Sequence, residues 1–446
     1  MTPHLRDQRS DVRGQRTAPA SVEPTARREA EAVDTDGIEG RQEPGIAGRQ
    51  SQISDQRSAI RIALLTGGSD KPYALGMAAA LTSEGILVDF IGSDDLNVPE
   101  VVTNHRVNFL NLRGDQRTDA SSFAKARRVL KYYIKLIGYA AIAQPKLFHL
   151  LWNNKFQFFD RTLLMLYYKL LGKKIVFTAH NVNAGKRDLN DSWLNRLSLN
   201  IQYRLSDHIF VHSESMKRQL VSEFAIAERK VSAIPFGINN TVPNTAISST
   251  AAKQHLGING GDKAMLFFGH IAPYKGLEYL VAAFTQLVKD DESYRLLIAG
   301  EIKRRRDYWN DIQKTIAESE IGHRITSRIE YIPDEEAELY FKAADVLILP
   351  YARVFQSGVL FLGYSFGLPA IAADVGCIKE EIAEGETGLV FRPQDPADLA
   401  RTIRQYFGST LFGELESRRG QIKAYANERY SWSKVAAITT SVYSSL

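Results

Sequence analysis

Short apolar runs alternate with longer amphipathic stretches along the chain from residue 59 onward. The first run, residues 59–66 with the sequence AIRIALLT, ends at Gly67 and Gly68, and the stretch YALGMAAALTSEG after it predicts a helix that Gly85 stops. Later runs have a similar length and composition: ILVDFIG, VNFLNL, PKLFHLLW, KKIVFTAHN, DHIFVHS and KVSAIPFGIN. Helical stretches separate them, the longest over residues 121–143. This alternation predicts an open parallel sheet covered by helices on both faces.

The alternation pauses at a polar stretch, residues 239–262, and then restarts. Strands are predicted at KAMLFFGHI, YRLLIAGE, RIEYIP, DVLILPY and AIAADV, again with helices between them. We therefore predict two doubly wound α/β domains, residues 59–238 and 263–446, with residues 239–262 as a linker. The last segment, YSWSKVAAITTSVYSSL, predicts an amphipathic helix that packs on either domain, including back on the first.

Residues 1–58 differ from the rest because they contain no Phe, Trp, Tyr or Lys. A segment with so little apolar surface to bury does not offset the entropy lost on ordering. We therefore predict a disordered N-terminal extension and assign no function to it.

Composition and charge narrow the class of protein. No apolar run reaches the roughly 18–20 residues of a membrane-spanning helix, and the start lacks the pattern of a secretory signal. Cys377 is the single cysteine, which excludes an intramolecular disulfide, argues against a cysteine zinc site and fits a reducing cytoplasm. The formal net charge of +5 fits a protein that handles phosphates or touches an anionic membrane, and it is too small to indicate nucleic-acid binding.

Polar residues follow several predicted strands, at the edge where open parallel sheets bind ligands. Gly67 and Gly68 let the backbone approach a ligand and open a helix start that favours anions, although a plain tight turn explains them too. His180 and Asn181 follow KKIVFT, where the histidine can donate a hydrogen bond to a sugar hydroxyl or satisfy a loop carbonyl. His149 has apolar neighbours and is a weaker candidate.

The second half offers a cation and a helix start. Lys275 follows a strand and precedes Gly276, a position suited to a diphosphate. Ser357 is predicted to cap a helix whose first amides would bind an anion; these amides belong to Ser357, Gly358, Val359 and Leu360. A capped helix without a ligand is the simpler alternative. Two acids at another helix start accept hydrogen bonds from hydroxyls or pair with the helix dipole: Glu380 and Glu381.

The predicted helix over residues 121–143 carries a basic stripe at three- and four-residue steps. The stripe consists of Lys125, Arg128, Lys131 and Lys135, and its apolar neighbours include Leu130, Ile134 and Ile137. Such a helix lies on anionic lipid or forms an ordinary solvated face.

With these residues in hand, the chain resembles the family-4 glycosyltransferases, which are retaining enzymes of the GT-B architecture. The strings that carry the resemblance run in family order from about residue 60 to 430; they include IVFTAHNVNAGKRD, VSAIPFGIN, FFGHIAPYKGLEYLVAAF and GLPAIAADVGCIKEEIAEGETGLVF. The resemblance implies two Rossmann-like domains that face each other across a cleft. The first would bind the acceptor and the second the nucleotide-sugar donor.

The resemblance also implies roles for single residues. His180 would reach the donor sugar and Lys275 would hold the diphosphate, so both are expected to be catalytic. The donor-binding set would be Gly67, Gly68, Asn181, Gly269, His270, Gln356, Ser357, Gly358, Val359, Leu360, Glu380 and Glu381. No metal and no cofactor are expected, since the nucleotide-diphosphate sugar is a substrate.

Two departures from the family pattern bear on activity. His270 stands where typical members have arginine, and Val354 and Leu362 stand where they have two glutamates. Some members carry SGVL at this place, as this chain does, so loss of activity does not follow from the departures.

The expected reaction is transfer of a hexosyl group, with retention, to a glycan or lipid-linked acceptor, in the cytoplasm or at the inner face of its membrane. Two alternatives stay open. A nucleotide-sugar epimerase would need an acid–base pair of carboxylates, and no such pair is evident. A non-catalytic nucleotide-binding homologue is favoured by the missing glutamates and opposed by Gly68, His180 and Lys275.

Overall fold

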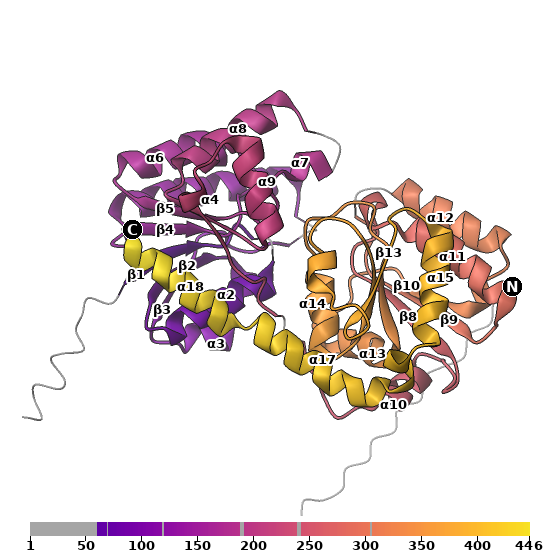
Figure 1. The fold of residues 1–446 in the computed structure, drawn as a ribbon. Helices are drawn as coiled ribbons and strands as arrows, with labels where there is room; N and C mark the ends of the chain where they lie inside the picture. The colour runs from indigo at the N-terminus through magenta and orange to yellow at the C-terminus, as the bar shows by residue number, and fades with distance from the viewer. Residues whose placement is uncertain (1–59, 69, 118–119, 188–190, 239–241, 304–305) are drawn as a thin grey trace, which may run out of the picture. The chain divides into compact units, whose positions relative to one another are not determined.

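The computed structural model describes residues 60–446, apart from residues 69, 118–119, 188–190, 239–241 and 304–305 (Figure 1). The predicted extension, residues 1–58, lies outside the described residues. The first sheet has seven strands in the order β3-β2-β1-β4-β5-β6-β7, and all of its pairs are parallel. The strands are β1 (Arg61–Leu65), β2 (Leu87–Gly92), β3 (Val107–Asn111), β4 (Leu147–Leu150), β5 (Lys174–Thr178), β6 (His208–Val211) and β7 (Val231–Ala233).

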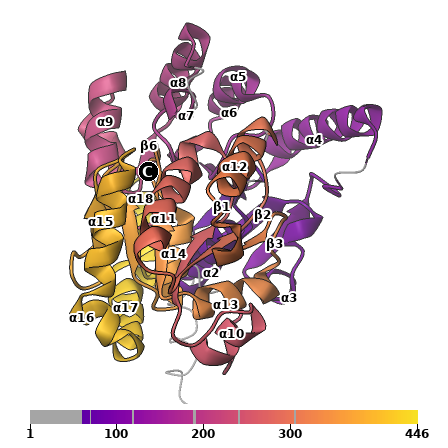
Figure 2. The same ribbon diagram turned by 90° about the vertical axis from the view of Figure 1, so that its right-hand side faces the viewer.

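Alternate side chains of these strands enter two apolar cores, one on each face of the sheet. Ile62 and Leu64 of β1 pack with α2 (Lys71–Ser83), near α3 (Pro99–Val102). Ala63 and Leu65 pack with the helices of the other face, which Figure 2 shows as one layer. This layer consists of α4 (Ser122–Ile142), α5 (Gln157–Phe159), the π-helical turn η2 (Asp160–Leu164), α6 (Met165–Leu170), α7 (Ala184–Arg187), α8 (Trp193–Leu205) and α9 (Glu214–Phe224).

The second sheet has six parallel strands in the order β10-β9-β8-β11-β12-β13. They are β8 (Lys263–Phe268), β9 (Tyr294–Ala299), β10 (Ile325–Arg328), β11 (Val346–Leu349), β12 (Ala370–Ala373) and β13 (Gly388–Phe391). The prediction of a strand at RIEYIP is wrong, because β10 pairs Arg328 with Ala299, the last residue of β9. Beyond Arg328 the chain has no neighbouring strand to continue the ladder. The two doubly wound domains that the alternation predicts are confirmed.

Two helical layers also cover the second sheet. One core contains α10 (Ser249–His255), α13 (Asp334–Ala343), α14 (Gly358–Ser365) and α17 (Leu415–Arg429). The other contains α11 (Leu277–Asp290), α12 (Arg306–Glu318) and α15 (Pro396–Phe407), with α16 (Thr410–Gly413) at its edge. The stretch predicted as a linker contains α10, and its buried Ala252 belongs to the first of these cores. Its polar composition hides this helix because Lys253 reaches inward to the buried carboxylate of Asp345 at 2.9 Å.

The last helix, α18 (Trp432–Ser445), packs on the first domain beside α2 (Figure 1). Val435 and Tyr443 are buried in the same core as α2, and the Tyr443 hydroxyl pairs with His149 of β4. The chain therefore returns to its first domain at the C-terminus. No helix in the part of the chain that the structure describes is both long and apolar enough to cross a membrane.

Candidate active site

The turn after β1 is closed by two glycines. Gly67 and Gly68 have φ angles of 61° and 73°, where side chains cause strain. A Cβ at Gly67 would lie 2.4 Å from the carbonyl oxygen of Trp152, and one at Gly68 would lie 2.5 Å from a guanidinium nitrogen of Arg113. Only glycine therefore fits at these two positions, because Trp152 and Arg113 approach the turn closely at the carboxyl edge of the first sheet.

His180, two residues after β5, lies among aromatic rings. Its imidazole stacks on Trp152 with centroids 4.0 Å apart and meets the edge of Tyr73 at 4.7 Å. Burial, reinforced by the neighbouring His212, lowers the pKa of His180 far below its usual value, so the ring is neutral at pH 7. Asn181, the next residue, is half-buried.

His180 forms a hydrogen-bonded pair with His212. Nδ1 of His212 faces the carbonyl of Ile234 at 3.3 Å, and its Nε2 lies 2.8 Å from Nδ1 of His180. Nε2 of His180 is buried and makes no direct hydrogen bond to any described residue, while the backbone of Leu151 acts against burial and raises the pKa of the ring. The expected hydrogen bond from His180 to a sugar hydroxyl stays a prediction.

Lys275 is buried rather than solvated. It ends the short 3₁₀ turn η4 (Pro273–Lys275), and Gly276 with φ 66° leads into α11. Its ammonium donates to the Tyr351 hydroxyl at 2.7 Å, and that hydroxyl lies 3.0 Å from Oγ of Ser357. A chain of polar groups thus joins η4, the segment just after β11 and the start of α14.

The start of α14 differs in detail from the prediction. Ser357 is the N-cap residue, but its side chain pairs with Tyr351 and makes no capping bond. The amide of Leu360 donates to the Ser357 carbonyl at 3.1 Å, so it is taken. The amides of Ser357, Gly358 and Val359 remain the candidates for an anion. Beside them, both amide atoms of the Gln356 side chain are buried and have no partner among the described residues.

The residues that differ from the family pattern have neutral side chains. Nδ1 of His270 lies 3.3 Å from a carboxylate oxygen of Glu301. Burial, then the nearby Lys303 and Lys275, lower the pKa of His270 to about 4, so a neutral imidazole stands where the family has arginine. Gly269 before it has φ 100°. The other two positions are apolar: Leu362 is buried in the core, and Val354 packs against it.

The two acids after β12 have different surroundings. They belong to the 3₁₀ turn η6 (Lys379–Glu381). Glu381 is buried and hydrogen-bonded to the hydroxyl of Tyr430, and burial raises the pKa of its carboxyl. Its carboxyl is therefore occupied by a structural partner, against the expectation of a hydroxyl-binding acid. Glu380 is exposed.

Comparisons with known proteins identify the class. Residues 72–241 match the family model "Glycosyltransferase Family 4", and residues 262–408 match "Glycosyl transferases group 1". The fold is similar to that of HepE from Anabaena in complex with UDP and glucose, with a TM-score of 0.68, 16% identity and coverage of 87% of this chain and 100% of that chain. The chain is a member of the GT-B glycosyltransferases.

Individual relatives are distant. A D-inositol 3-phosphate glycosyltransferase of Pseudarthrobacter chlorophenolicus is 26% identical over 247 residues, which cover 54% of this chain and 57% of the relative. The glycosyltransferase thus spans somewhat more than half the length of that relative. Sucrose-phosphate synthase from Thermosynechococcus elongatus has a TM-score of 0.69 at 19% identity, over 86% of this chain and 98% of that chain.

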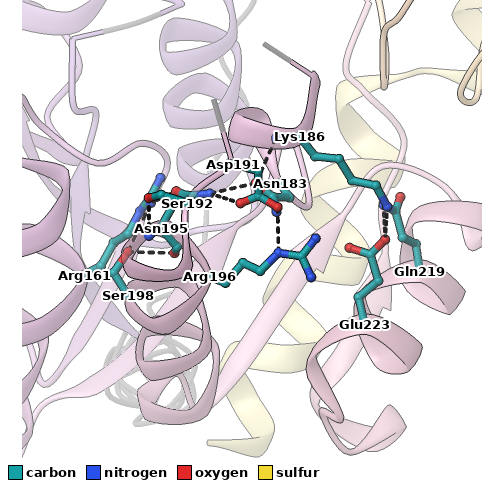
Figure 3. Close-up of polar contacts among 10 residues, drawn as sticks. All are labelled: Arg161, Asn183, Lys186, Asp191, Ser192, Asn195, Arg196, Ser198, Gln219 and Glu223. Atoms are coloured by element: carbon teal, nitrogen blue, oxygen red, sulfur yellow. Dashed lines mark hydrogen bonds and ion pairs between the residues drawn. The ribbon is translucent and has the colours of Figure 1, made fainter. Parts of the chain in front are cut away.

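The loop of the glycosyltransferase that carries His180 is anchored by a polar network (Figure 3). Oδ1 of Asn183 accepts from the Asn195 side chain at 2.9 Å, and Asn195 also donates to Asp191 at 2.8 Å. Arg161 of η2 donates to Asn195 at 2.8 Å. The segment after β5 is therefore tied to η2 and α8.

Several site residues of the glycosyltransferase are absent from the sequence prediction. Tyr351 and Arg113 each lie one or two residues beyond a strand, so the rule that located His180 and Lys275 would have found them. Trp152 obeys the same rule, since it lies two residues beyond β4. His212 directly follows β6, and its value depends on a contact with His180 that the local sequence does not reveal.

Proposed function

We propose that the glycosyltransferase moves a hexosyl group from a nucleotide-diphosphate sugar to a glycan or lipid-linked acceptor, with retention at the anomeric carbon. The observation that carries the proposal is the buried chain Lys275–Tyr351–Ser357 at the start of α14. It combines a desolvated cation with unbonded helix amides, which together suit a departing diphosphate. HepE, which shares the fold, binds UDP and UDP-glucose, and this supports a nucleotide donor.

Each group in the site has a part in the proposed step. The bond between the anomeric carbon and the diphosphate breaks, and Lys275 with the amides of Ser357 to Val359 meets the negative charge that forms. Tyr351 orients the ammonium through its hydroxyl. Burial holds the pKa of Tyr351 above its usual value, so the hydroxyl stays neutral. We propose no metal and no cofactor.

Retention fits a front-face reaction in this site. The acceptor oxygen would attack from the side on which the diphosphate leaves, and a diphosphate oxygen would take its proton, so no enzyme carboxylate is needed. This suits the apolar residues Val354 and Leu362. Nε2 of His180 would form a hydrogen bond with a sugar hydroxyl and hold the donor in place.

Donor binding is tested first, by the thermal midpoint of the full chain with UDP-, GDP- and ADP-sugars. A ligand at a hundredfold excess over its Kd stabilises by about 2.7 kcal/mol. Lys275→Ala should abolish the response, and Lys289→Ala, at an exposed lysine of α11, should keep it. A donor that binds without transfer to any acceptor would support the non-catalytic homologue, and conversion of the donor without acceptor would support an epimerase.

Exposed apolar side chains gather on the helices of one face of the first domain. Among the described residues, all but two of the large exposed hydrophobic side chains belong to the segment from the start of α4 to the end of α8. The two others are Val102 and Tyr331. Those of α4 are Phe123, Leu130, Ile134, Ile137 and Ile142. The Tyr167 hydroxyl of α6 donates to the Ile137 carbonyl at 3.1 Å, so the exposed surfaces of α4 and α6 are neighbours.

We propose that this apolar face of α4, η2, α6 and α8 docks on an anionic bilayer at the inner face of the cytoplasmic membrane. Lys131 and Lys135 are exposed on α4 beside Leu130 and Ile134, and such a mixture of apolar and basic residues binds anionic interfaces. The stripe expected from the sequence is split, because Arg128 instead forms an ion pair with Asp115 at 3.0 Å.

Vesicle flotation tests the docking. Wild-type protein should float with phosphatidylglycerol vesicles and much less with phosphatidylcholine. The double variant Leu130→Asp/Ile134→Asp should stay at the bottom, whereas Tyr331→Asp, at an exposed apolar residue of the other domain, should float. Equal flotation of both variants would overturn the assignment of this face.

A further inference from the structure

A cationic pocket lies in the first domain, and its lining includes Arg113, the neighbour of Gly68. Its volume is about 290 Å³, and it lies between the loop after β3, the N-terminal half of α4 and the segment after β4. Five of its described lining residues carry a positive charge, and none carries a negative one. The cations are Arg113, Arg117, Lys125, Arg128 and Lys155.

Arg113 is held in place by the side chains of Asn154 and Tyr132. Its Nη1 donates to Oδ1 of Asn154 at 3.1 Å, and its guanidinium lies 5.2 Å from the ring centroid of Tyr132. The Tyr132 hydroxyl donates to the same oxygen of Asn154 at 2.6 Å. Nε of Arg113 is buried and has no hydrogen-bond partner among the described residues. A half-buried cation whose buried N–H has no partner among the described residues, beside a cavity, suits an acceptor.

Two described acids lie close to the pocket but do not line it. Asp115 is shared between two cations, at 3.0 Å from Nη1 of Arg128 and 3.1 Å from Nη2 of Arg117. Asp160, behind the pocket wall, accepts from the hydroxyl of Tyr133 at 2.9 Å; burial raises the pKa of its carboxyl to about 6, so it is still mostly ionised at pH 7. All charged residues among the described lining are cations, and such a lining suits a polyanionic group.

The pocket also borders the glycine turn. The guanidinium of Arg113 lies so close to Gly68 that a Cβ there would collide with it, so an anion bound by Arg113 lies at the carboxyl edge of β1. On its outer side, Phe123 and Phe156 are exposed next to the lining residues Lys125 and Lys155. The pocket thus joins the reactive edge of the first sheet to the apolar face of α4.

We propose that this pocket binds a phosphate or diphosphate group of the acceptor, so that the acceptor is a phosphorylated molecule. The inference rests on the proposed transfer reaction. The donor's own diphosphate is assigned to Lys275 in the second domain, which leaves the pocket for the acceptor. A lipid headgroup and a free phosphorylated compound share the recognised chemistry.

The test uses inorganic pyrophosphate with the full chain in a Lys275→Ala background, which removes the donor site. Pyrophosphate should raise the thermal midpoint, and adding Arg128→Gln should raise its Kd about tenfold or more, since charge-assisted bonds to phosphate are lost. Lys155→Glu should weaken binding as strongly, and because Lys155 is exposed this variant does not depend on refolding of the core. The matched control Lys146→Glu, an exposed lysine of the same domain, should bind as before.

The arms of the experiment separate the outcomes. Phosphatidylcholine vesicles doped with phosphatidic acid supply a lipid headgroup. If pyrophosphate displaces the protein from these vesicles and Lys155→Glu abolishes this competition, the phosphate belongs to a lipid. If the protein binds pyrophosphate but pyrophosphate does not displace it from the vesicles, the phosphate belongs to a free compound. Pyrophosphate binding that is equal in Lys155→Glu, Arg128→Gln and Lys146→Glu would overturn the inference. Nucleotide-sugar binding should be unchanged in Lys155→Glu with Lys275 intact. If the wild-type protein binds no nucleotide sugar, that result counts against the proposed transfer reaction and not against the pocket.

Discussion

Burial determines what single polar residues of this glycosyltransferase can do. Lys275 is buried and donates a hydrogen bond to Tyr351, and an ammonium taken out of water attracts an anion more strongly than a solvated one. His180 loses its charge for the same reason, so it can orient a sugar but not balance a diphosphate. The two expected catalytic residues therefore have different tasks.

Gly276 should be the residue that holds Lys275 in register. Gly276 and Gly257 have nearly equal φ angles, 66° and 69°, but a Cβ at Gly276 would lie 2.0 Å from the Pro350 carbonyl oxygen, whereas one at Gly257 would meet nothing within 4 Å. Gly257→Ala should cost about 1–2 kcal/mol through the left-handed backbone alone. Gly276→Ala should cost clearly more in urea unfolding and abolish the response to nucleotide sugar. Equal losses would mean that the close approach to Pro350 is unimportant.

The positions of candidate residues are easier to predict than their partners. Strand ends located His180 and Lys275, because carboxyl edges of parallel strands bind ligands irrespective of sequence detail. The partner of each comes from far along the chain: Tyr351 lies 76 residues after Lys275 and His212 lies 32 after His180. Periodicity carries no information on such contacts, so the hydrogen bond of Ser357 to Tyr351 and the pairing of His180 with His212 required the structure.

At the scale of elements, local pattern predicts type better than extent. The apolar runs gave the strands of both sheets except β13, whose four residues GLVF are only partly buried, and β10, whose ends are set by its neighbour β9. The helix α10 was hidden by its polar sequence. The local pattern does not predict the order of the strands in each sheet, because that order depends on pairing between strands that are tens of residues apart.

The joint between α2 and α18 offers a test at this scale. Trp432 is wedged between two glycines: a Cβ would lie 2.2 Å from its ring at Gly76 of α2 and 2.4 Å from it at Gly237. Its indole N–H also donates to the Ile238 carbonyl at 3.0 Å, so the ring cannot move freely. In a helix interior, Gly→Ala normally stabilises by about 0.5–1 kcal/mol.

Gly76→Ala should reverse that sign. We expect it to destabilise by about 1–3 kcal/mol, as overpacking does, and to free α18 for proteolysis. Gly420→Ala in α17, where a Cβ would meet nothing within 4 Å, should stabilise. Urea unfolding and limited proteolysis of both variants measure the effect. A stabilised Gly76→Ala protein with a protected C-terminus would show that Trp432 can be displaced at little cost.

At the scale of the whole molecule, the first domain is built around neutral histidines. Burial lowers the pKa of His149 to about 3 and those of His208 and His212 to about 4. His149 of β4 forms hydrogen bonds to two other elements: Nε2 pairs with Thr178 of β5 at 2.8 Å, and Nδ1 pairs with Tyr443 of α18. One imidazole therefore joins two strands to the C-terminal helix, and its protonation would force the hydroxyl that donates to the neutral ring to turn and accept instead.

This arrangement predicts a loss of stability in mild acid. The pKa of His149 falls on folding from 6.5 to about 3, so the unfolded chain binds the proton more strongly between these values, and stability falls as the pH drops below 6.5. Between pH 7 and pH 5 the loss from this group is about 2 kcal/mol. In His149→Asn the loss is absent, so the free energy of unfolding of wild-type protein should drop by that amount relative to the variant. His105→Asn, at an exposed histidine, is the control. Parallel pH curves for wild type and His149→Asn would show that this imidazole takes up its proton without loss of stability, and that its bond to Tyr443 is not needed to hold α18.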